Sequence, residues 1–387
     1  MNTNDRWLSA LDGATGKACA GFGRDGQVDT AADIQLDRPG GMQITSPPVV
    51  ARGVVAVGSA GAVQAFDAVT GAPRWRFDPL ASANPWIVAA AANVWPPISV
   101  DEARGLVFLP TTGLRPDFCG CLRKGDDRDA DSVVALNIET GAKVWAFKTV
   151  HQDVWDYDNP VPPTLAMVAW QGVLLPTALQ STKQGLMVTL NRDSDRRVIL
   201  VEERPVPQAV APAPSGIGLK DAFGLTPWDK AQCRRKIAGA RHDGPFTPSS
   251  VGGMIEYPFT GGGSNRGGLA FDAARQVAFV NTARALHLIT LIPADKVQAA
   301  CRAEPDVEIS PQAGAPFGMR REVMRSSLGL PCNPPPWGRL HTIDMRTGRI
   351  IWAARLGTTE DLAPGSQFVL PHAGAPNFCG SITTASG

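Results

Sequence analysis

Residues 151–160, HQDVWDYDNP, gather three carboxylates and a histidine around a tryptophan. An ionised aspartate in a partly dry pocket can accept the proton of a substrate hydroxyl, so Asp153, Asp156 and Asp158 are all candidate bases. Aspartate is also an ordinary turn residue, because its carboxylate bonds back to the turn backbone. The stretch alone leaves the three carboxylates equivalent, with a simple turn as the alternative.

A repeated phrase shows what kind of element must position these side chains. Each copy has an apolar stretch, Asp or Asn, a short turn ending in Thr-Gly or a decayed version, and a second apolar stretch that commonly contains Trp. This pattern predicts β-hairpins, since Gly accepts positive φ and Asp or Asn bonds to the turn backbone. The copies are ALDGATGKACAGF from Ala10, AFDAVTGAPRWRF from Ala65, ALNIETGAKVWAF from Ala135, TIDMRTGRIIWAA from Thr342 and a weaker TLNRDSDRRVILV from Thr189.

Further strand-like stretches lie between the copies, and helical periodicity is weak apart from a short helix predicted over 226–240. Units of several antiparallel strands, repeated along a chain, favour an all-β fold of the β-propeller type. Trp75, Trp145 and Trp352 occupy equivalent places in three copies, which predicts packing between blades. The repeat lapses between 201 and 260, where a Pro-rich stretch predicts an excursion rather than a domain linker.

Several ordered phrases resemble the pyrroloquinoline quinone (PQQ) dependent dehydrogenases, in particular the membrane-bound glucose, quinate and polyol dehydrogenase group. The phrases are TSPPVV (45–50), NVWPPISVDEARGLVFLPTTG (93–113), DSVVALNIETGAKVWAFKTVHQDVWDYDNPVPPTLA (131–166), STKQGLMVTLNR (181–192), ERPVPQ (203–208), GLTPWDKAQCRRKI (224–237) and GLPCNPPPWG (329–338). The resemblance implies an eight-bladed propeller with PQQ near its axis. We expect residues 1–387 to be a single domain of this type, truncated at both ends, with about five to six blades.

The resemblance also separates the carboxylates, because the family's base directly follows the tryptophan and so corresponds to Asp156. It assigns Lys183, in STKQG, to the quinone oxygens, where a cation stabilises the charge that develops on reduction. It assigns Trp95, in NVWPP, to stacking on the cofactor plane, and Asn281 to the quinone edge. A solvated loop lysine and a plain strand-end asparagine are the alternatives for Lys183 and Asn281.

Other positions depart from the family pattern. Arg266 replaces a family tryptophan and Arg115 replaces a small polar residue, and an arginine can pair with a PQQ carboxylate. His151 is a candidate for the substrate side, with a structural histidine as the alternative. The family's divalent cation, Ca²⁺ or Mg²⁺, is expected to lack its Asp-Asn ligand pair, because VAVGSAGAVQAFD (55–67) omits the insertion that carries it. We therefore assign no metal ligand.

Net charge and composition limit the kinds of molecule that the chain is expected to bind. A net charge of +1 and 19% charged residues give no electrostatic footprint for nucleic acid, and favour a neutral small-molecule substrate. The start is no signal peptide, and no apolar run reaches 18 residues, so membrane association is expected through a segment absent from this chain.

The seven cysteines include no pair of CxxC clusters, and Cys119 and Cys121 are too close for an unstrained loop-closing bridge. By resemblance, a bridge between Cys233 and Cys332 suits a periplasmic protein.

Two hypotheses of different class follow. The first is a quinoprotein oxidoreductase that oxidises a hydroxyl of a sugar or cyclic polyol of the glucose and quinate class. In this hypothesis PQQ accepts the hydride, ubiquinone accepts the electrons, and the protein lies on the periplasmic side of the inner membrane. The second is a catalytically decayed or partial propeller that serves as a binding or scaffold module. The sequence does not decide which sugar or polyol is the substrate.

Overall fold

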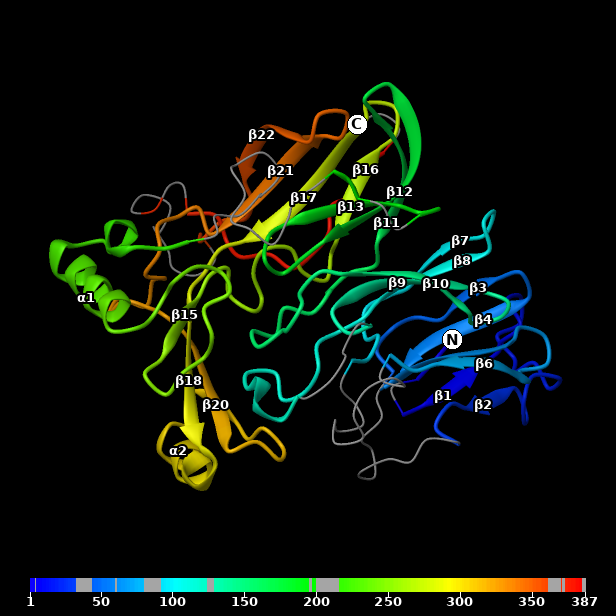
Figure 1. Cartoon of the computed structure of the whole chain (residues 1–387), viewed down its shortest axis with the longest axis horizontal. Helices are drawn as coiled ribbons and strands as arrows, with labels where there is room; N and C mark the ends of the chain where they lie inside the picture. Colours follow the sequence, from blue (N-terminus) through cyan, green and yellow to red (C-terminus); the bar gives the residue numbers. More distant parts are fainter. Residues whose placement is uncertain are drawn as a thin grey trace. The chain divides into compact units, whose positions relative to one another are not determined.

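The structure is a computed structural model, and strands dominate it (Figure 1). It describes residues 1–3, 5–32, 44–59, 61–79, 92–123, 129–194, 197–199, 216–360, 370 and 373–384. The chain divides into two compact units. Unit 1 comprises Met1–Arg115, Arg123–His151 and Asp158–Leu165, and unit 2 comprises Pro116–Leu122, Gln152–Tyr157 and Ala166–Gly387.

Unit 1 has, in its described residues, one two-stranded and two four-stranded antiparallel sheets. Strands follow one another in chain order within each four-stranded sheet, so each strand pairs with the next one along the chain. The sheets are β1 (Trp7–Ser9) with β2 (Gln27–Asp29); β3 (Val49–Ala51), β4 (Val54–Ser59), β5 (Ala62–Asp67) and β6 (Pro73–Phe77); and β7 (Ser99–Asp101), β8 (Leu106–Pro110), β9 (Ser132–Asn137) and β10 (Lys143–Lys148).

The predicted turn chemistry is present in the repeats. In the β5–β6 turn, Oδ1 of Asp67 accepts hydrogen bonds from the backbone N–H groups of Val69 and Thr70, at 3.1 and 2.8 Å. Gly71 follows with φ of 71°, which only glycine adopts without cost. The corresponding turn between β9 and β10 uses Asn137 in the same way. In both four-stranded sheets of unit 1 the repeated phrase is therefore the last hairpin.

An apolar core lies between the two four-stranded sheets of unit 1, with Val63 of β5 and Val134 of β9 fully buried in it. Trp75 on β6 reaches the other sheet, because its indole N–H donates to the backbone oxygen of Ile138 at 2.7 Å. Its ring covers Gly141, where an added Cβ would come within 2.7 Å of the ring carbons. For Trp75, the predicted packing between sheets is confirmed.

Unit 2 contains three four-stranded antiparallel sheets among its described residues. Two of them, β11–β14 and β16–β17–β21–β22, end in a copy of the repeated phrase and share an apolar core. The strands are β11 (Thr164–Trp170), β12 (Val173–Ser181), β13 (Met187–Asn191) and β14 (Arg197–Ile199); then β16 (Leu269–Asp272), β17 (Val277–Ala283), β21 (Gly338–Asp344) and β22 (Arg349–Arg355).

The third sheet of unit 2 carries no copy of the phrase and is an insertion. Its strand order is β15-β18-β20-β19, and β18 to β20 lie between β17 and β21 in the chain. The bounds are β15 (Met254–Glu256), β18 (His287–Pro293), β19 (Glu308–Ser310) and β20 (Phe317–Val323), with α2 (Val297–Ala303) between β18 and β19. The short turns η1 (Gly120–Leu122), η2 (Leu219–Asp221) and η3 (Ala294–Lys296) are 3₁₀ helices.

The predicted helix over 226–240 is confirmed as α1 (Pro227–Ala238). Thr226 caps it, since its hydroxyl accepts from the backbone N–H of Asp229 at 3.1 Å, and proline occupies the first helical position. The Pro-rich stretch that precedes this helix falls outside the described residues, which resume at residue 216.

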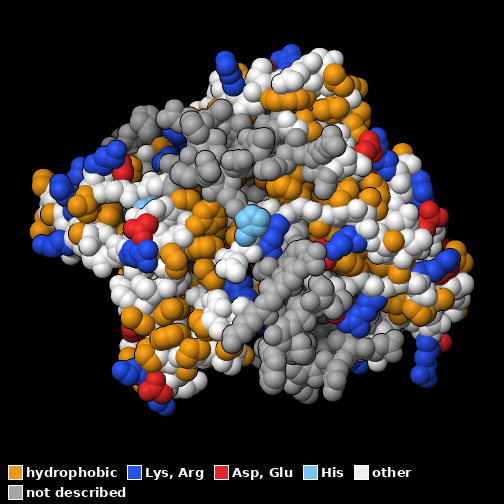
Figure 2. All heavy atoms as spheres, viewed as in Figure 1, with side chains coloured by type: hydrophobic (Ala, Val, Ile, Leu, Met, Phe, Trp, Pro, Cys, Tyr) orange, Lys and Arg blue, Asp and Glu red, His pale blue; other side chains and the backbone are white. Residues whose placement is uncertain are grey.

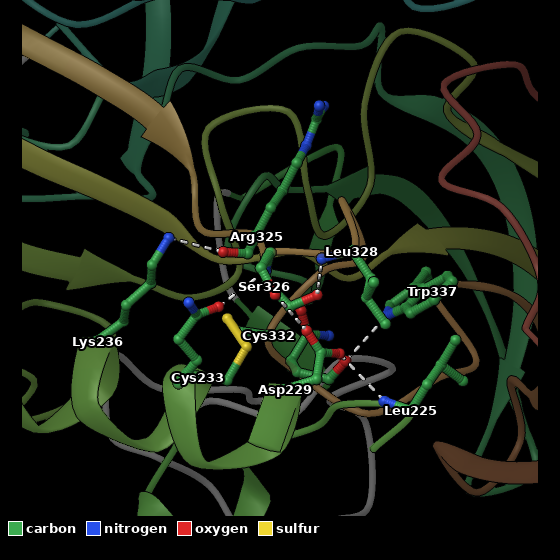
Figure 3. The surroundings of a disulfide bond; sticks show 12 residues. Leu225, Asp229, Cys233, Lys236, Arg325, Ser326, Leu328, Cys332 and Trp337 are labelled. Atoms are coloured by element: carbon green, nitrogen blue, oxygen red, sulfur yellow. Dashed lines mark hydrogen bonds between the residues drawn. A yellow bond between two sulfur atoms is a disulfide. The ribbon is translucent and has the colours of Figure 1, made fainter. Parts of the chain in front are cut away.

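Two disulfides are present in unit 2. Cys233 on α1 is bonded to Cys332, as predicted, with a Cα–Cα distance of 5.2 Å (Figure 3). Cys119 and Cys121 are also bonded to each other, although the short spacing argued against an unstrained bridge.

The fold class follows from these elements. The described residues form antiparallel sheets with few helices, and each copy of the phrase marks one repeated unit, so the all-β prediction of five to six units is confirmed.

On the face seen in Figure 2, the described Lys and Arg side chains are interspersed with acidic and apolar ones, as the net charge of +1 predicts. Among the described residues, no helix has the length and apolarity needed to cross a membrane.

Candidate functional site

The segment 152–157 is held in unit 2 by its odd-numbered residues. The carboxylate of Asp153 accepts hydrogen bonds from the backbone N–H groups of Trp155 and Tyr157, at 2.9 and 2.7 Å. The Trp155 indole donates to the backbone oxygen of Thr247 at 2.6 Å, and the Tyr157 hydroxyl donates to that of Pro258 at 3.1 Å. Asp153 therefore shapes the turn, as predicted, and the two rings anchor it in the core.

Asp156 lies between these two anchored rings in an uncommon backbone conformation. Its φ is 60°, in the left-handed region that costs a residue with a Cβ of order 1–3 kcal/mol and that clusters at functional sites. Its side chain keeps 27% of its surface exposed, whereas Trp155 and Tyr157 are buried. A strained, partly accessible carboxylate between two rigid supports is suited to meet a ligand.

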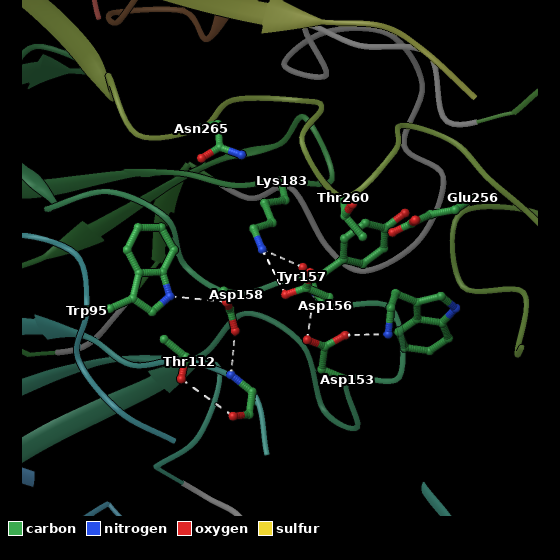
Figure 4. A network of polar contacts seen from close by, with 12 residues as sticks. Trp95, Thr112, Asp153, Asp156, Tyr157, Asp158, Lys183, Glu256, Thr260 and Asn265 are labelled. Atoms are coloured by element: carbon green, nitrogen blue, oxygen red, sulfur yellow. Dashed lines mark hydrogen bonds and ion pairs between the residues drawn. The ribbon is translucent and has the colours of Figure 1, made fainter. Parts of the chain in front are cut away.

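Lys183 contacts Asp156 twice (Figure 4). Its Nζ donates to the backbone oxygen of Asp156 at 2.6 Å and to Oδ1 at 3.1 Å, and its side chain is only 6% exposed. A close approach fixes the loop that carries Lys183: Gly263 has φ of 58°, and a Cβ there would lie 2.1 Å from the Lys183 backbone oxygen. Lys183, which was predicted to bond the quinone oxygens, therefore lies buried against Asp156, and this disfavours the solvated loop alternative.

A second cation, Arg321 on β20, was not found by the sequence reasoning. Its Nη1 is 3.1 Å from Oδ2 of Asp156 and donates to the Thr260 hydroxyl at 3.0 Å. Two further bonds go to Glu308, from Nε at 2.9 Å and from Nη2 at 2.6 Å. The guanidinium also lies over the ring of Phe118, 5.7 Å from its centroid. No local pattern marks Arg321, because 165 residues separate it from Asp156.

Three buried titratable side chains, those of Glu256, His287 and Tyr157, lie near Asp156 and Arg321. Glu256 on β15 is 1% exposed, and burial together with the Asp156 charge raises the pKa of its carboxyl well above the usual range. Burial and the Arg321 charge lower the pKa of His287 on β18 to about 3. Burial, Glu256 and Asp153 raise the pKa of the Tyr157 hydroxyl. His287 is therefore uncharged at neutral pH, and burial disfavours the charged forms of Glu256 and Tyr157.

Trp95 and Asp158 form a separate arrangement within unit 1. The Trp95 indole N–H donates to Oδ2 of Asp158 at 3.2 Å, and the backbone N–H of Gly113 donates to Oδ1 at 2.8 Å (Figure 4). Trp95 is half-buried, and its own backbone N–H bonds the Asn93 side chain at 3.2 Å. Asp158 thus positions the indole, which agrees with the supporting role expected for it.

The remaining predicted residues lie elsewhere in their units. Asn281, on β17 in unit 2, is 8% exposed and its amide donates to the backbone oxygen of Cys379. Arg266, also in unit 2, is exposed on the loop before β16. His151 and Arg115 are exposed residues of unit 1. Among the predicted residues, therefore, Asp156 and Lys183 are in direct contact.

Comparison with known proteins gives matches along the whole chain. Residues 1–387 match the family model described as the β-propeller domain of PQQ-dependent glucose, ethanol and alcohol dehydrogenases. Quinoprotein glucose dehydrogenase A of Acinetobacter calcoaceticus is 33% identical, with 99% of this chain and 53% of that protein covered. A probable quinate dehydrogenase (quinone) of Xanthomonas campestris pv. juglandis is 34% identical, with 100% and 54% covered.

Solved structures agree on the fold. A europium-containing methanol dehydrogenase superposes with a TM-score of 0.66 at 18% identity, covering 100% of this chain and 62% of that one. The quinohemoprotein alcohol dehydrogenase of Comamonas testosteroni gives 0.62 at 19% identity, with 90% and 50% covered. The chain spans about half the length of the curated relatives it matches. It belongs to the PQQ-dependent glucose, ethanol and alcohol dehydrogenase family and has that family's β-propeller fold.

Proposed function

We propose that this chain is the cofactor-binding part of a PQQ-dependent dehydrogenase that oxidises a hydroxyl of a sugar or cyclic polyol. The observation that carries the proposal is the Asp156 carboxylate, which is strained, partly exposed and held between two cations. Relatives named as glucose, quinate and glycerol dehydrogenases support the substrate class. Electron transfer to ubiquinone and a place on the periplasmic side of the inner membrane belong to the same proposal.

The proton is handled by Asp156. Its carboxylate accepts the proton of the substrate hydroxyl, and the adjacent ammonium of Lys183 and guanidinium of Arg321 favour its ionised form before that step. Strain in the backbone at Asp156 is maintained by the anchored rings on either side, so the carboxylate needs little reorganisation.

Within unit 2, the chemistry of the buried Lys183 ammonium fits PQQ, because a cation suits an anionic quinone. The half-buried Trp95 of unit 1 keeps its proposed role as the aromatic face for the flat cofactor. When bound, PQQ supplies the acceptor for the hydride that leaves the substrate carbon. Lys183 would stabilise the negative charge of the reduced form, while Asn281 and Arg266 remain proposed contacts at the cofactor edge.

A divalent cation bound through Asp156 does not fit the contacts of this site. Both carboxylate oxygens face cationic side chains at 3.1 Å, and Ca²⁺ or Mg²⁺ requires several oxygen ligands. The alignment with the glucose dehydrogenase spans 428 positions against 387 residues in this chain, so that relative carries segments that are missing here. We therefore propose that cofactor binding does not require a divalent cation at Asp156.

The second candidate function is a non-catalytic binding or scaffold module. The engagement of both Asp156 oxygens by cations favours it, since a base must release a partner before it can take a proton.

PQQ titration of the purified protein, with and without Ca²⁺ or Mg²⁺, tests the proposal when combined with dye reduction on glucose, quinate and glycerol. We expect cofactor binding in EDTA, and turnover that falls about 10²–10⁴-fold in Asp156→Asn. Binding without turnover in the wild type establishes the scaffold function instead. Absence of PQQ binding refutes the cofactor assignment and the role of Trp95.

A further inference from the structure

Two adjacent arginines of β20 in the inserted sheet, Arg320 and Arg321, point to opposite faces of that sheet. Side chains alternate along β20, so Arg320 and Arg321 face away from each other. Arg320 pairs with Glu304 and Glu322, at 2.6 and 2.8 Å. Arg321 lies on the other face, opposite Glu308 of β19 in the strand register. The two residues have the same charge and separate partners, which makes Arg320 a matched control for Arg321.

Arg321 is fixed from four directions. Glu308 holds the guanidinium by two parallel bonds, a geometry that specifies orientation as well as charge. Phe118 lies under its face, and the Thr260 hydroxyl meets Nη1, the same nitrogen that reaches Asp156. Hydrogen bonding to Glu308 and the Asp156 charge raise the pKa of Arg321 although burial opposes this. The cation therefore stays charged and has little freedom to turn away from Asp156.

The Thr260 hydroxyl connects Arg321 to His287. An arginine has only donors, so the Thr260 oxygen must accept from Arg321. Nδ1 of His287 lies 3.1 Å from the same hydroxyl. Burial and the Arg321 charge lower the pKa of His287 to about 3, so the imidazole is neutral at neutral pH, and its Nε2–H tautomer can accept the hydroxyl hydrogen of Thr260 at Nδ1.

Glu256 completes the chain of contacts. It pairs with His287 in the register of β15 and β18, and its Oε2 is 3.7 Å from Nδ1. Among the described residues, neither Glu256 oxygen has a hydrogen-bond partner. Burial raises the pKa of the Glu256 carboxyl, which disfavours a negative charge beside His287. Because the pKa of His287 is lowered to about 3, the imidazole supplies no positive charge to Glu256 at neutral pH.

We propose that Arg321 is a positioning residue for the base Asp156, and that Thr260, by donating to His287, directs its own oxygen to Arg321 and so keeps Arg321 on Asp156. This rests on the proposed function, in which Asp156 is the base. Lys183, Tyr157 and Asp153 face the same cluster from the loops of unit 2, and Glu308 faces it from β19. A cavity of about 430 Å³ borders Arg321 and His287, and its other charged residues are Lys236, Asp306, Glu308, Glu322 and Arg325.

The direct test measures the titration of the Asp156 carboxylate in PQQ-free protein by ¹³C NMR of labelled aspartate side chains. The Asp156 signal is assigned as the one that is lost in Asp156→Asn. We expect Arg321→Gln to raise the titration midpoint by about one pH unit or more, because one of two cations is removed. Arg320→Gln removes an equal charge from the opposite face, and we expect the midpoint to stay where it is. Equal shifts in the two variants, or no shift in either, overturn the proposal.

The chain behind Arg321 is tested by milder changes that keep the protein folded. Thr260→Val removes the hydroxyl and is expected to raise the Asp156 midpoint, whereas Thr260→Ser keeps the hydroxyl and is expected to restore it. A Thr260→Ser protein that titrates like Thr260→Val refutes the orientation role.

Turnover of the PQQ-loaded variants separates this inference from the proposed function. If Asp156 is the base, the acid limb of kcat/KM moves in Arg321→Gln and Thr260→Val together with the NMR midpoint. Full turnover in Asp156→Asn refutes the proposed function while the NMR titration still decides whether Arg321 controls Asp156. Loss of turnover in Asp156→Asn with unmoved midpoints in every variant refutes the inference alone.

Discussion

The disulfide between Cys233 and Cys332 is expected to be a major source of stability for unit 2. Both sulfurs are fully buried, and 99 positions separate the two residues, so the bridge closes a loop of about 100 residues in the unfolded chain. The chain-entropy relation gives about 4.7 kcal/mol for such a loop. A domain's total free energy of unfolding is only about 5–15 kcal/mol, so the loss in Cys233→Ala/Cys332→Ala is large.

The folded state of this variant is expected to persist, because hydrogen bonds also hold α1 to the segment after β20. Lys236 donates to the backbone oxygen of Arg325 at 2.8 Å, and the Ser327 hydroxyl donates to Asp229 at 3.2 Å (Figure 3). The cost therefore falls mainly on the entropy of the unfolded chain, which the bridge no longer restricts. Urea unfolding followed by tryptophan fluorescence measures it as a lower midpoint with an intact folded baseline.

The second bridge provides the matched comparison. Cys119 and Cys121 are two positions apart, and the same relation gives about 1.6 kcal/mol for a loop this short. Cys119→Ala/Cys121→Ala should therefore lose about 3 kcal/mol less than the other double variant. If the two double variants unfold at the same urea concentration, loop closure is not what the long bridge contributes and the reasoning fails.

Three further predictions concern single positions. Gly263→Ala should displace the backbone of Lys183, since a Cβ would lie 2.1 Å from its oxygen, and we expect weaker PQQ binding by titration and a lower Tm. Glu256 has a raised folded-state pKa, so its contribution to stability is lost as pH rises above about 4.5. Relative to the wild type, Glu256→Gln should gain free energy of unfolding with increasing pH, by up to about 1.4 kcal/mol per pH unit, and a Tm difference that stays constant with pH contradicts this. Trp75→Phe should cost about 1 kcal/mol in urea unfolding, because the bond to Ile138 is lost, and an unchanged midpoint contradicts the packing role.

Local chemistry explains which parts of the fold were predictable. The Asp or Asn followed by Thr-Gly specifies its turn through contacts within four residues, as at Asp67 and Gly71, so sequence alone identifies these hairpins. Tryptophan packing depends on neighbouring elements and was predicted less well. Trp75 lies between two sheets, whereas Trp352 is 44% exposed and its ring is tilted against Phe279 of its own sheet.

The inserted sheet was not predicted, because the excursion expected between 201 and 260 includes β15 alone and β18 to β20 lie beyond it. Nothing near residue 321 distinguishes Arg321 from Arg320, because their roles depend on which face of β20 each occupies and on a sheet whose strand order departs from the chain order. Glu256 and His287 could not be singled out from the sequence either, since the shifts of their pKa values follow from burial and from the charges that the fold places near them. A polar residue placed on a strand is ordinary until its partners are known.

The three carboxylates of residues 151–160 acquire different roles from the groups their oxygens contact. Asp153 accepts two backbone N–H groups of its own turn, so its charge is used to hold the loop. Asp158 accepts a backbone N–H and the Trp95 indole, so it orients an aromatic side chain. Asp156 instead meets Lys183 and Arg321, and retains 27% exposure. Because Asp153 builds the turn that places Asp156 in the left-handed conformation, its substitution by Asn should weaken both backbone bonds and disturb the base without touching it.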